Sequence, residues 1–144
     1  RAGRDPAAVR IYAAIVAAPS LPPEHEAAVV GGRAITYLQA PGFGELLVGV
    51  NGWDVAVLGK LRSHPLLASL GRGGLADQAF TLDQLGQVAK VLPEEWIREG
   101  AAAGTPERCA ARLREYLDAG VDEIVLHGNV PSALAEVIAA FRQE

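Results

Sequence analysis

The chain has 144 residues, of which 50% are apolar and 21% charged, a composition typical of a globular domain with its own core. Its formal net charge of −4 argues against a basic surface for nucleic acid or anionic membranes. A single cysteine, Cys109, excludes an internal disulfide and gives no metal-ligand spacing. No apolar run approaches the ~18 residues of a transmembrane helix. We therefore expect a cytoplasmic protein.

The opening residues 1–6, RAGRDP, have the pattern of a helix end followed by its stop. Methionine is absent from the whole sequence. Together these features suggest part of a longer protein, although processing of a precursor would give the same appearance.

Residues 9–18, VRIYAAIVAA, form a continuous apolar run bounded by Pro6 and Pro19. Such a run predicts a strand buried on both faces, although a buried helix gives a similar pattern. A helix is then expected over residues 22–39, where prolines and Glu24 suit the first turn. Gly31-Gly32 predicts a kink or split in it, because each glycine costs about 1 kcal/mol relative to alanine.

The stretch up to residue 100 predicts further short helices and no second strand. These helices are expected at residues 45–50, at 54–63 with Asp54 as cap, at 82–92 with Thr81 as cap, and from Pro93 onward. Residues 66–74 are expected to form a loop, because they contain three glycines. We therefore interpret residues of about 22–100 as a helical insertion within a single partial domain, 1–144.

Residues 104–128, GTPERCAARLREYLDAGVDEIVLHG, predict a helix capped by Thr105, a glycine stop at Gly120 and a short apolar strand. A last helix is expected from Pro131. A helix that leads into a buried strand is the repeating unit of α/β barrels and doubly wound sheets. Two strands alone would leave exposed sheet edges, which favours a homo-oligomer or association with a missing part of the fold.

Three segments together resemble the C-terminal part of the luciferase-like monooxygenases, flavin- or deazaflavin-dependent oxidoreductases with a TIM-barrel fold. Residues 2–18 resemble that family's helix end and seventh strand, residues 104–128 its last full helix and eighth strand, and residues 130–143 its final helix. Residues 37–54, YLQAPGFGELLVGVNGWD, are similar to the helical insertion of the deazaflavin-dependent branch.

The resemblance implies the C-terminal part of a (β/α)8 TIM barrel, with about two parallel strands and a helical insertion. The parent protein would transfer hydride between a small organic substrate and the deazaflavin coenzyme F420, with FMN as the alternative, or use the cofactor for oxygen chemistry. Most contacts to the cofactor ring would come from preceding strands, so this segment is expected to be inactive alone. Two alternatives remain open. One is a non-catalytic fragment that forms one wall of a pocket or an oligomer interface; the other is an unrelated α/β enzyme with a phosphate site after its last strand.

His127 is a candidate site residue because it ends the last predicted strand, and strand ends of this kind line TIM-barrel active sites. A histidine held by a loop hydrogen bond is the plainer interpretation. Gly128 and Asn129 follow, where backbone N–H groups at a helix start can hold an anion; an ordinary cap explains them as well.

Four residues of the predicted insertion are candidates for a substrate pocket, although packing of short helices explains them equally well. They are Tyr37, Gln39, Phe43 and Trp53. Arg33 is a candidate partner for an anionic cofactor tail or a solvated surface arginine.

Other chemistry-bearing residues are not expected to form sites. Cys109 has no adjacent base, and the paired acids 94–95 and 122–123 begin a helix and a strand. His25 and His64 are isolated and expected to be exposed. Residues 71–74, GRGG, lack the preceding strand that a phosphate loop requires. No metal site is predicted.

Overall fold

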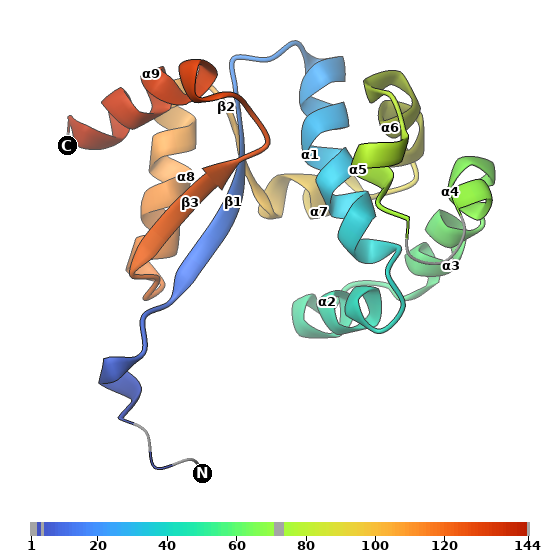
Figure 1. Cartoon of the computed structure of the whole chain (residues 1–144), viewed down its shortest axis with the longest axis horizontal. Coiled ribbons are helices and arrows are strands. Elements are labelled where there is room, and N and C mark those ends of the chain that lie inside the picture. Colours follow the sequence, from blue (N-terminus) through green and yellow to red (C-terminus); the bar gives the residue numbers. More distant parts are fainter. Residues whose placement is uncertain (1–2, 4, 71–73, 144) are drawn as a thin grey trace. The chain divides into compact units, whose positions relative to one another are not determined.

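The computed structural model describes residues 3, 5–70 and 74–143. The protein is a helix-rich α/β fold with a small parallel sheet of three strands (Figure 1). The chain divides into two compact units: unit 1 comprises Arg1–Ser20 with Ala101–Glu144, and unit 2 comprises Leu21–Gly100. Unit 2 covers nearly the same residues as the predicted helical insertion.

Unit 1 contains the sheet and two long helices. Its elements are the 3-10 turn η1 (Pro6–Ala8), β1 (Tyr12–Pro19), β2 (Ala101–Gly104), α8 (Pro106–Asp118), β3 (Glu123–His127) and α9 (Pro131–Arg142). The elements described in unit 2 are all helices. They are α1 (Pro23–Leu38), α2 (Phe43–Asn51), α3 (Ala56–Arg62), α4 (Pro65–Leu70), α5 (Ala76–Ala79), α6 (Leu82–Ala89) and α7 (Glu94–Glu99).

The sheet has the order β2-β1-β3, with both pairs parallel. The expectation of only two strands was wrong, because β2 is a run of three alanines and a glycine without the β-branched or aromatic residues that indicate a strand. The first strand is shorter than predicted. It is buried only from Ile15 onward, while Tyr12 and Ala14 are exposed.

Two helices cover one face of the sheet. Ile15 of β1 packs there with Cys109 and Leu113 of α8 and Val137 of α9. Thr105 caps α8 as predicted, with its hydroxyl oxygen accepting the N–H of Arg108 at 3.3 Å. The buried face thus holds the apolar side of each helix, as the 3.6-residue period predicts.

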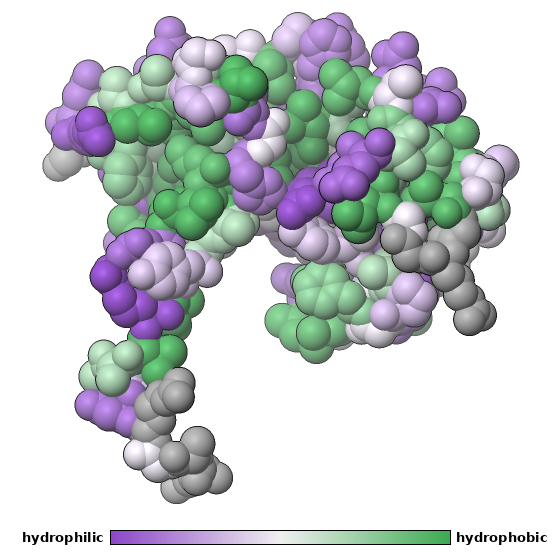
Figure 2. Space-filling model, in the orientation of Figure 1, coloured by the Kyte–Doolittle hydropathy of each residue, from purple (hydrophilic) through white to green (hydrophobic). Residues whose placement is uncertain are grey.

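The opposite face of the sheet is exposed along β3 and the first half of β1. Tyr12 and Val125 have exposed fractions of 54% and 52%. The register pairs Ala14 with Val125, so these side chains share a face. Figure 2 shows hydrophobic surface over β3. Parallel sheets normally have both faces covered.

Unit 2 has its own core, centred on α1 and α6. Helix α1 is continuous through Gly31-Gly32, so the predicted split there was wrong. A Cβ atom on Gly31 would lie 2.6 Å from the Cβ of Ala89, and one on Gly32 would lie 2.9 Å from a methyl carbon of Leu85. The glycines therefore allow α1 and α6 to approach closely, and the packing offsets their low helix propensity.

Other local expectations differ from the structure at element ends. The loop predicted from residue 66 begins as α4, whose Leu67 is buried, while residues 71–73 of that prediction lie outside the described residues. Thr81 caps α6 as predicted, but α6 ends at Ala89. Asp54 accepts the N–H of Ala56 at 2.9 Å just before α3.

The expected helix stop at Pro6 was wrong, because Pro6 begins the η1 turn, and the Oδ1 atom of Asp5 accepts the N–H of Ala7 there at 3.0 Å. Residues 1, 2 and 4 of that prediction lie outside the described residues. Among the residues that the structure describes, no helix has the length and apolar character needed to cross a membrane.

Candidate functional site

The carboxyl ends of the three strands lie at one edge of the sheet, because all three run in the same direction. The strands end at Pro19, Gly104 and His127. The edge is staggered: Pro19 pairs with Gly104, whereas His127 pairs with Val16. A three-residue offset corresponds to about 10 Å along a strand. His127 therefore shares the edge with the ends of β1 and β2 but lies at a different level.

His127 is partly buried and shares its sheet face with Val125. Gly128 follows with a φ of 88°, a conformation that favours glycine, and turns the chain toward α9. The Oδ1 atom of Asn129 accepts the N–H of Val130 at 3.0 Å. Val130 is the N-cap of α9 and Pro131 occupies its first turn. Two backbone positions at this helix start thus offer no free N–H to an anion, fewer donors than the sequence suggested.

Ser20 is a residue of this edge that sequence reasoning missed. It follows β1 with a φ of 54°, the one positive φ outside glycine among the described residues. Its N–H donates to the carbonyl oxygen of Gly104 at 2.7 Å, which joins the ends of β1 and β2. Residues held in this conformation are uncommon and cluster at functional sites. The only signal in the sequence was a serine placed between a strand and a proline pair.

The start of α8 adds ionised and polar groups at the end of β2. Gly104 has a φ of 104°. The pKa of Glu107 lies below its usual range, because its own backbone N–H and the Thr105 hydroxyl donate hydrogen bonds to its carboxylate. Glu107 is therefore ionised near neutral pH, and its negative charge interacts favourably with the positive end of the α8 dipole.

Two of the four pocket candidates of unit 2 lie together. The rings of Tyr37 and Phe43 meet edge to face with their centroids 5.5 Å apart. The guanidinium of Arg33 lies 4.6 Å from the Tyr37 ring centroid and forms an ion pair with Asp77 at 2.9 Å. Nε of Arg33 and Oδ1 of Asp77 are buried without a hydrogen-bond partner in the described part of the chain. This cluster can therefore accept one more polar group beside an aromatic wall.

The other two candidates have structural contacts elsewhere in unit 2. The side-chain amide of Gln39 donates to the carbonyl oxygen of Gly74 at 3.0 Å. Trp53 stacks on Trp96 with centroids 4.4 Å apart and an interplanar angle of 11°, and it packs against the unit 2 core. His127 belongs to unit 1, so the predicted site residues are divided between the two compact units.

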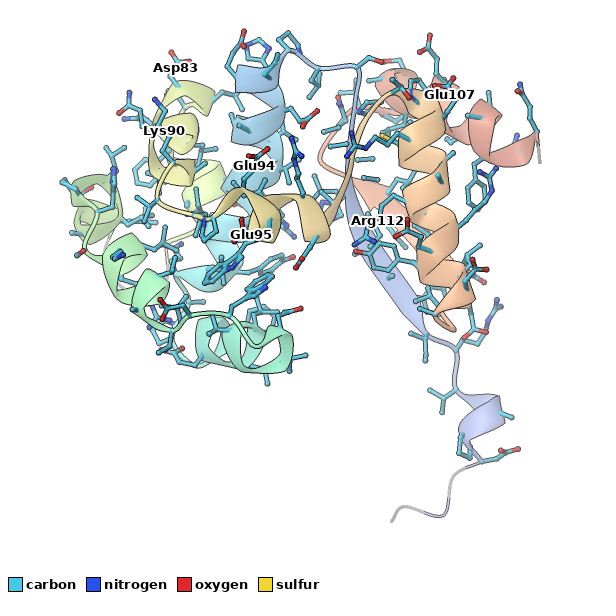
Figure 3. All side chains as sticks on the ribbon, turned by 180° about the vertical axis from the view of Figure 1, so that it is seen from behind. Asp83, Lys90, Glu94, Glu95, Glu107 and Arg112 are labelled. Atoms are coloured by element: carbon cyan, nitrogen blue, oxygen red, sulfur yellow. The ribbon has the colours of Figure 1, made fainter. Side chains whose placement is uncertain are left out.

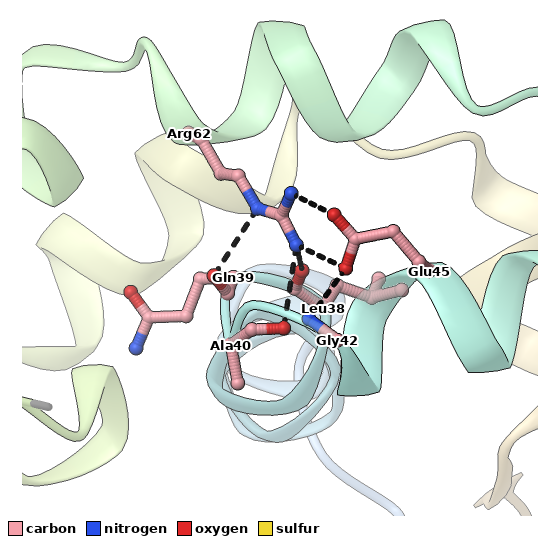
Figure 4. Close-up of polar contacts among 6 residues, drawn as sticks. All are labelled: Leu38, Gln39, Ala40, Gly42, Glu45 and Arg62. Atoms are coloured by element: carbon pink, nitrogen blue, oxygen red, sulfur yellow. Dashed lines mark hydrogen bonds and ion pairs between the residues drawn. The ribbon is translucent and has the colours of Figure 1, made fainter. Parts of the chain in front are cut away.

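Arg62 holds the turn between α1 and α2, which carries Gln39 and Ala40 (Figure 4). Its Nε donates to the carbonyl oxygen of Gln39 at 3.2 Å, and its Nη2 donates to those of Leu38 and Ala40, each at 3.3 Å. Its two terminal nitrogens also bind both carboxylate oxygens of Glu45, at 2.5 and 3.0 Å. The guanidinium thus caps the negative end of α1 and joins α3 to α2.

Protonation of Glu45 at low pH is expected to lower the stability of unit 2. The Arg62 hydrogen bond, with backbone N–H groups, lowers the pKa of Glu45 from 4.5 to about 2. A carboxylate whose folded pKa is depressed stabilises the fold above its unfolded pKa, and that stability is lost as pH falls toward the folded value. We therefore expect the free energy of unfolding to decrease from about pH 4.5 to about pH 2.

Urea titrations across this pH range check the expectation. The Glu45→Gln variant should show a shallower decrease than the wild type, because it has no carboxylate to protonate. Glu95→Gln, at an exposed position of α7, is the control. If the free energy of unfolding depended on pH identically in the wild type and Glu45→Gln, Glu45 would not be the cause of the acid destabilisation.

Most of the other titratable residues considered above are buried or have structural contacts. Cys109 is fully buried. Asp122 accepts the N–H of Ile11 at 2.7 Å, and Glu123 pairs with Arg10 at 2.6 Å. His25 is exposed as expected, whereas His64 is partly buried. No cluster of metal-ligating side chains occurs within the residues that the structure describes.

Comparisons with protein-family models, with curated proteins and with solved structures returned no match to this chain. Its function therefore has to be inferred from its own residues and their geometry.

Proposed function

We propose that this chain is the closing part of a (β/α)8 barrel of the luciferase-like type. In this proposal β1 and β3 are the last two barrel strands, and unit 2 is the insertion between them. The complete barrel binds the deazaflavin coenzyme F420, or FMN, and transfers hydride between the cofactor and a small organic substrate. The sequence resemblance supplies the family, and the parallel strand-helix arrangement supports it.

The main support for the proposal is the partly unpaired edge and the exposed face of the sheet. Strand β2 pairs with β1 only from Val16 to Pro19, so Tyr12–Ile15 lack a strand partner on that edge within the described residues. The face opposite α8 and α9 exposes Tyr12 and Val125. A neighbouring strand would satisfy that edge, and a barrel interior would cover that face. The stagger between β1 and β3 is also what barrel closure requires.

The strand ends fit the polar groups of a flavin-type cofactor. His127 and Ser20 place an imidazole and a hydroxyl at the carboxyl edge, and Gly128 lets the backbone approach a ligand. The cofactor would supply the hydride chemistry. The protein's share would be orientation, with His127 donating a hydrogen bond to a cofactor or substrate oxygen.

Cofactor titration tests the proposal on the protein expressed from its complete reading frame. His127→Ala is expected to weaken F420 or FMN affinity about tenfold, as the loss of one hydrogen bond would. Fluorescence quenching of the cofactor gives the dissociation constant. His64→Ala, which removes a histidine of unit 2, is the matched control. The absence of binding to both cofactors, or equal affinity of His127→Ala and the wild type, would refute the proposal.

A second candidate function is a non-catalytic module that self-associates. One face of α2 carries Phe43, Leu46 and Val50, with exposed fractions of 45%, 57% and 76%. Their spacing of three and four residues places them in one stripe, which Figure 2 shows as hydrophobic surface on α2. A second copy of the chain would cover such a stripe.

Self-association through α2 is checked by sedimentation. The double variant Leu46→Glu and Val50→Lys should shift the protein from dimer to monomer, because charges would be buried at the interface. Lys60→Glu, on exposed α3 surface, should leave the dimer intact. A monomeric wild type at all concentrations would eliminate this candidate.

A further inference from the structure

Unit 2 contains a pocket that the proposed function does not use. It has a volume of about 520 Å³ and lies between α1, α6 and the start of α7. This volume is within the range of small-molecule sites, about 300–1,000 Å³. None of the residues discussed above as cofactor or substrate contacts lines it.

The floor of the pocket is apolar and is formed by very small residues. Ala28 of α1 and Ala89 of α6 are buried, and both line the pocket with Gly86. A Cβ atom on Gly86 would find only the Cβ of Ala28, at 3.9 Å. The hollow therefore exists because larger side chains are missing where the two helices meet.

Charged groups of opposite sign stand at the two ends of this floor. Helices α1 and α6 run in the same direction, because Gly86 lies beside Ala28 and Ala89 beside Gly31. Glu24 and Asp83, both in first turns, consequently mark one end, and Lys90, the C-cap of α6, marks the other. Asp83 and Lys90 are labelled in Figure 3. Lys90 follows Asp83 by seven positions, which corresponds to a rise of about 10 Å along a helix.

These three charges have no ion-pair partner among the described residues. Glu94, also at the pocket rim, differs because it pairs with Arg98 at 2.5 Å. The pocket therefore presents two available carboxylates, an apolar floor and one available ammonium in that order.

We propose that this pocket binds a short zwitterion with an amine at one end, a carboxylate at the other and an aliphatic linker between them. The ammonium of the ligand meets Glu24 and Asp83, its carboxylate meets Lys90, and its linker lies on the alanine-glycine floor. Charge complementarity at both ends selects this class over a plain amine or a plain fatty acid. The site is independent of the cofactor site proposed at His127.

Calorimetric titration of the full chain with 6-aminohexanoate, hexylamine and hexanoate tests the ligand class. The zwitterion should bind saturably, with one site and at least tenfold more tightly than either single-charge analogue. Lys90→Gln should weaken zwitterion binding about tenfold and leave hexylamine binding unchanged. Asp83→Asn should weaken the zwitterion and hexylamine alike.

Gly86→Leu tests the place of binding, because its side chain would fill the hollow and should abolish binding of all three compounds. Gly86→Ala, whose Cβ has room, should bind more tightly than Gly86→Leu and controls for the loss of glycine. Lys60→Gln, outside the pocket, should match the wild type. Absence of saturable binding to the wild type, equal affinity for hexylamine and 6-aminohexanoate, or insensitivity to both Lys90→Gln and Gly86→Leu would overturn the proposal. None of these outcomes depends on F420 or FMN binding.

Discussion

Replacing Gly31 with alanine is expected to destabilise unit 2 by about 1–3 kcal/mol, the usual cost of overpacking a core. The same change at Gly59 is expected to stabilise it by up to about 1 kcal/mol, the difference in helix propensity between the two residues. The two substitutions are chemically identical, and both positions are helical. Only the surroundings differ.

The opposite signs follow from the space beside each glycine. A Cβ atom on Gly31 would lie 2.6 Å from the Cβ of Ala89, an atom that moves only if the α6 backbone moves. A Cβ atom on Gly59 would find nothing within 4 Å. Both changes restrict the unfolded chain in the same way, so the difference between them isolates the α1–α6 contact.

Urea unfolding followed by circular dichroism measures both effects, with the midpoint and slope compared between variants. A third variant, Gly49→Ala on α2, also has open space at its Cβ position and should behave as Gly59→Ala does. Stabilisation by Gly31→Ala would show that α1 and α6 do not approach as closely as described.

Replacing Arg62 with alanine is expected to cost about 1.5–3 kcal/mol, the range for losing hydrogen bonds that involve charged groups. This one side chain binds three carbonyl oxygens at the end of α1 and both carboxylate oxygens of Glu45. Its removal would leave the negative end of α1 without its cap. Gly44 shows how tight this turn is, since a Cβ atom there would lie 2.2 Å from the carbonyl oxygen of Leu38.

The stability cost of Arg62→Ala is compared with the cost of removing an exposed ion pair. Arg98 and Glu94 form an ion pair within α7, with side-chain exposures of 62% and 72%. Arg98→Ala should therefore cost only about 0–0.5 kcal/mol. Arg62→Lys should fall between the two, because an ammonium cannot reproduce the fork geometry. Equal unfolding midpoints for Arg62→Ala and Arg98→Ala would contradict the proposed role of the cap.

Much of the helical structure could be predicted from local signals. Thr81 and Thr105 begin helices where their hydroxyls accept backbone N–H groups, because capping depends on residues three positions apart. The strand that ends at His127 was predicted from its apolar run and the preceding glycine. Strand β2 was missed because an alanine run becomes a strand only where a neighbouring strand pairs with it.

The candidate site was less accessible to sequence reasoning. His127 could be singled out because a polar residue at a strand end is a local pattern. Ser20 was not singled out. Its φ is positive, and its N–H binds Gly104, a residue far away in the chain that local spacing does not place beside it. Tyr37 and Phe43 meet across one turn, whereas Trp53 stacks on Trp96, a partner that spacing alone could not identify.

The sequence by itself determined where the threonine-capped helices α6 and α8 begin, which side of each is apolar, and that two α/β segments enclose a helical stretch. These properties depend on neighbours within a few residues. Only the tertiary structure decided that Gly31 marks a close helix contact rather than a break, and that β1 is the central strand. It also decided that Glu24, Asp83 and Lys90 line one pocket. Those outcomes depend on which residues from distant parts of the chain pack beside each element. Short-range sequence patterns do not encode that packing.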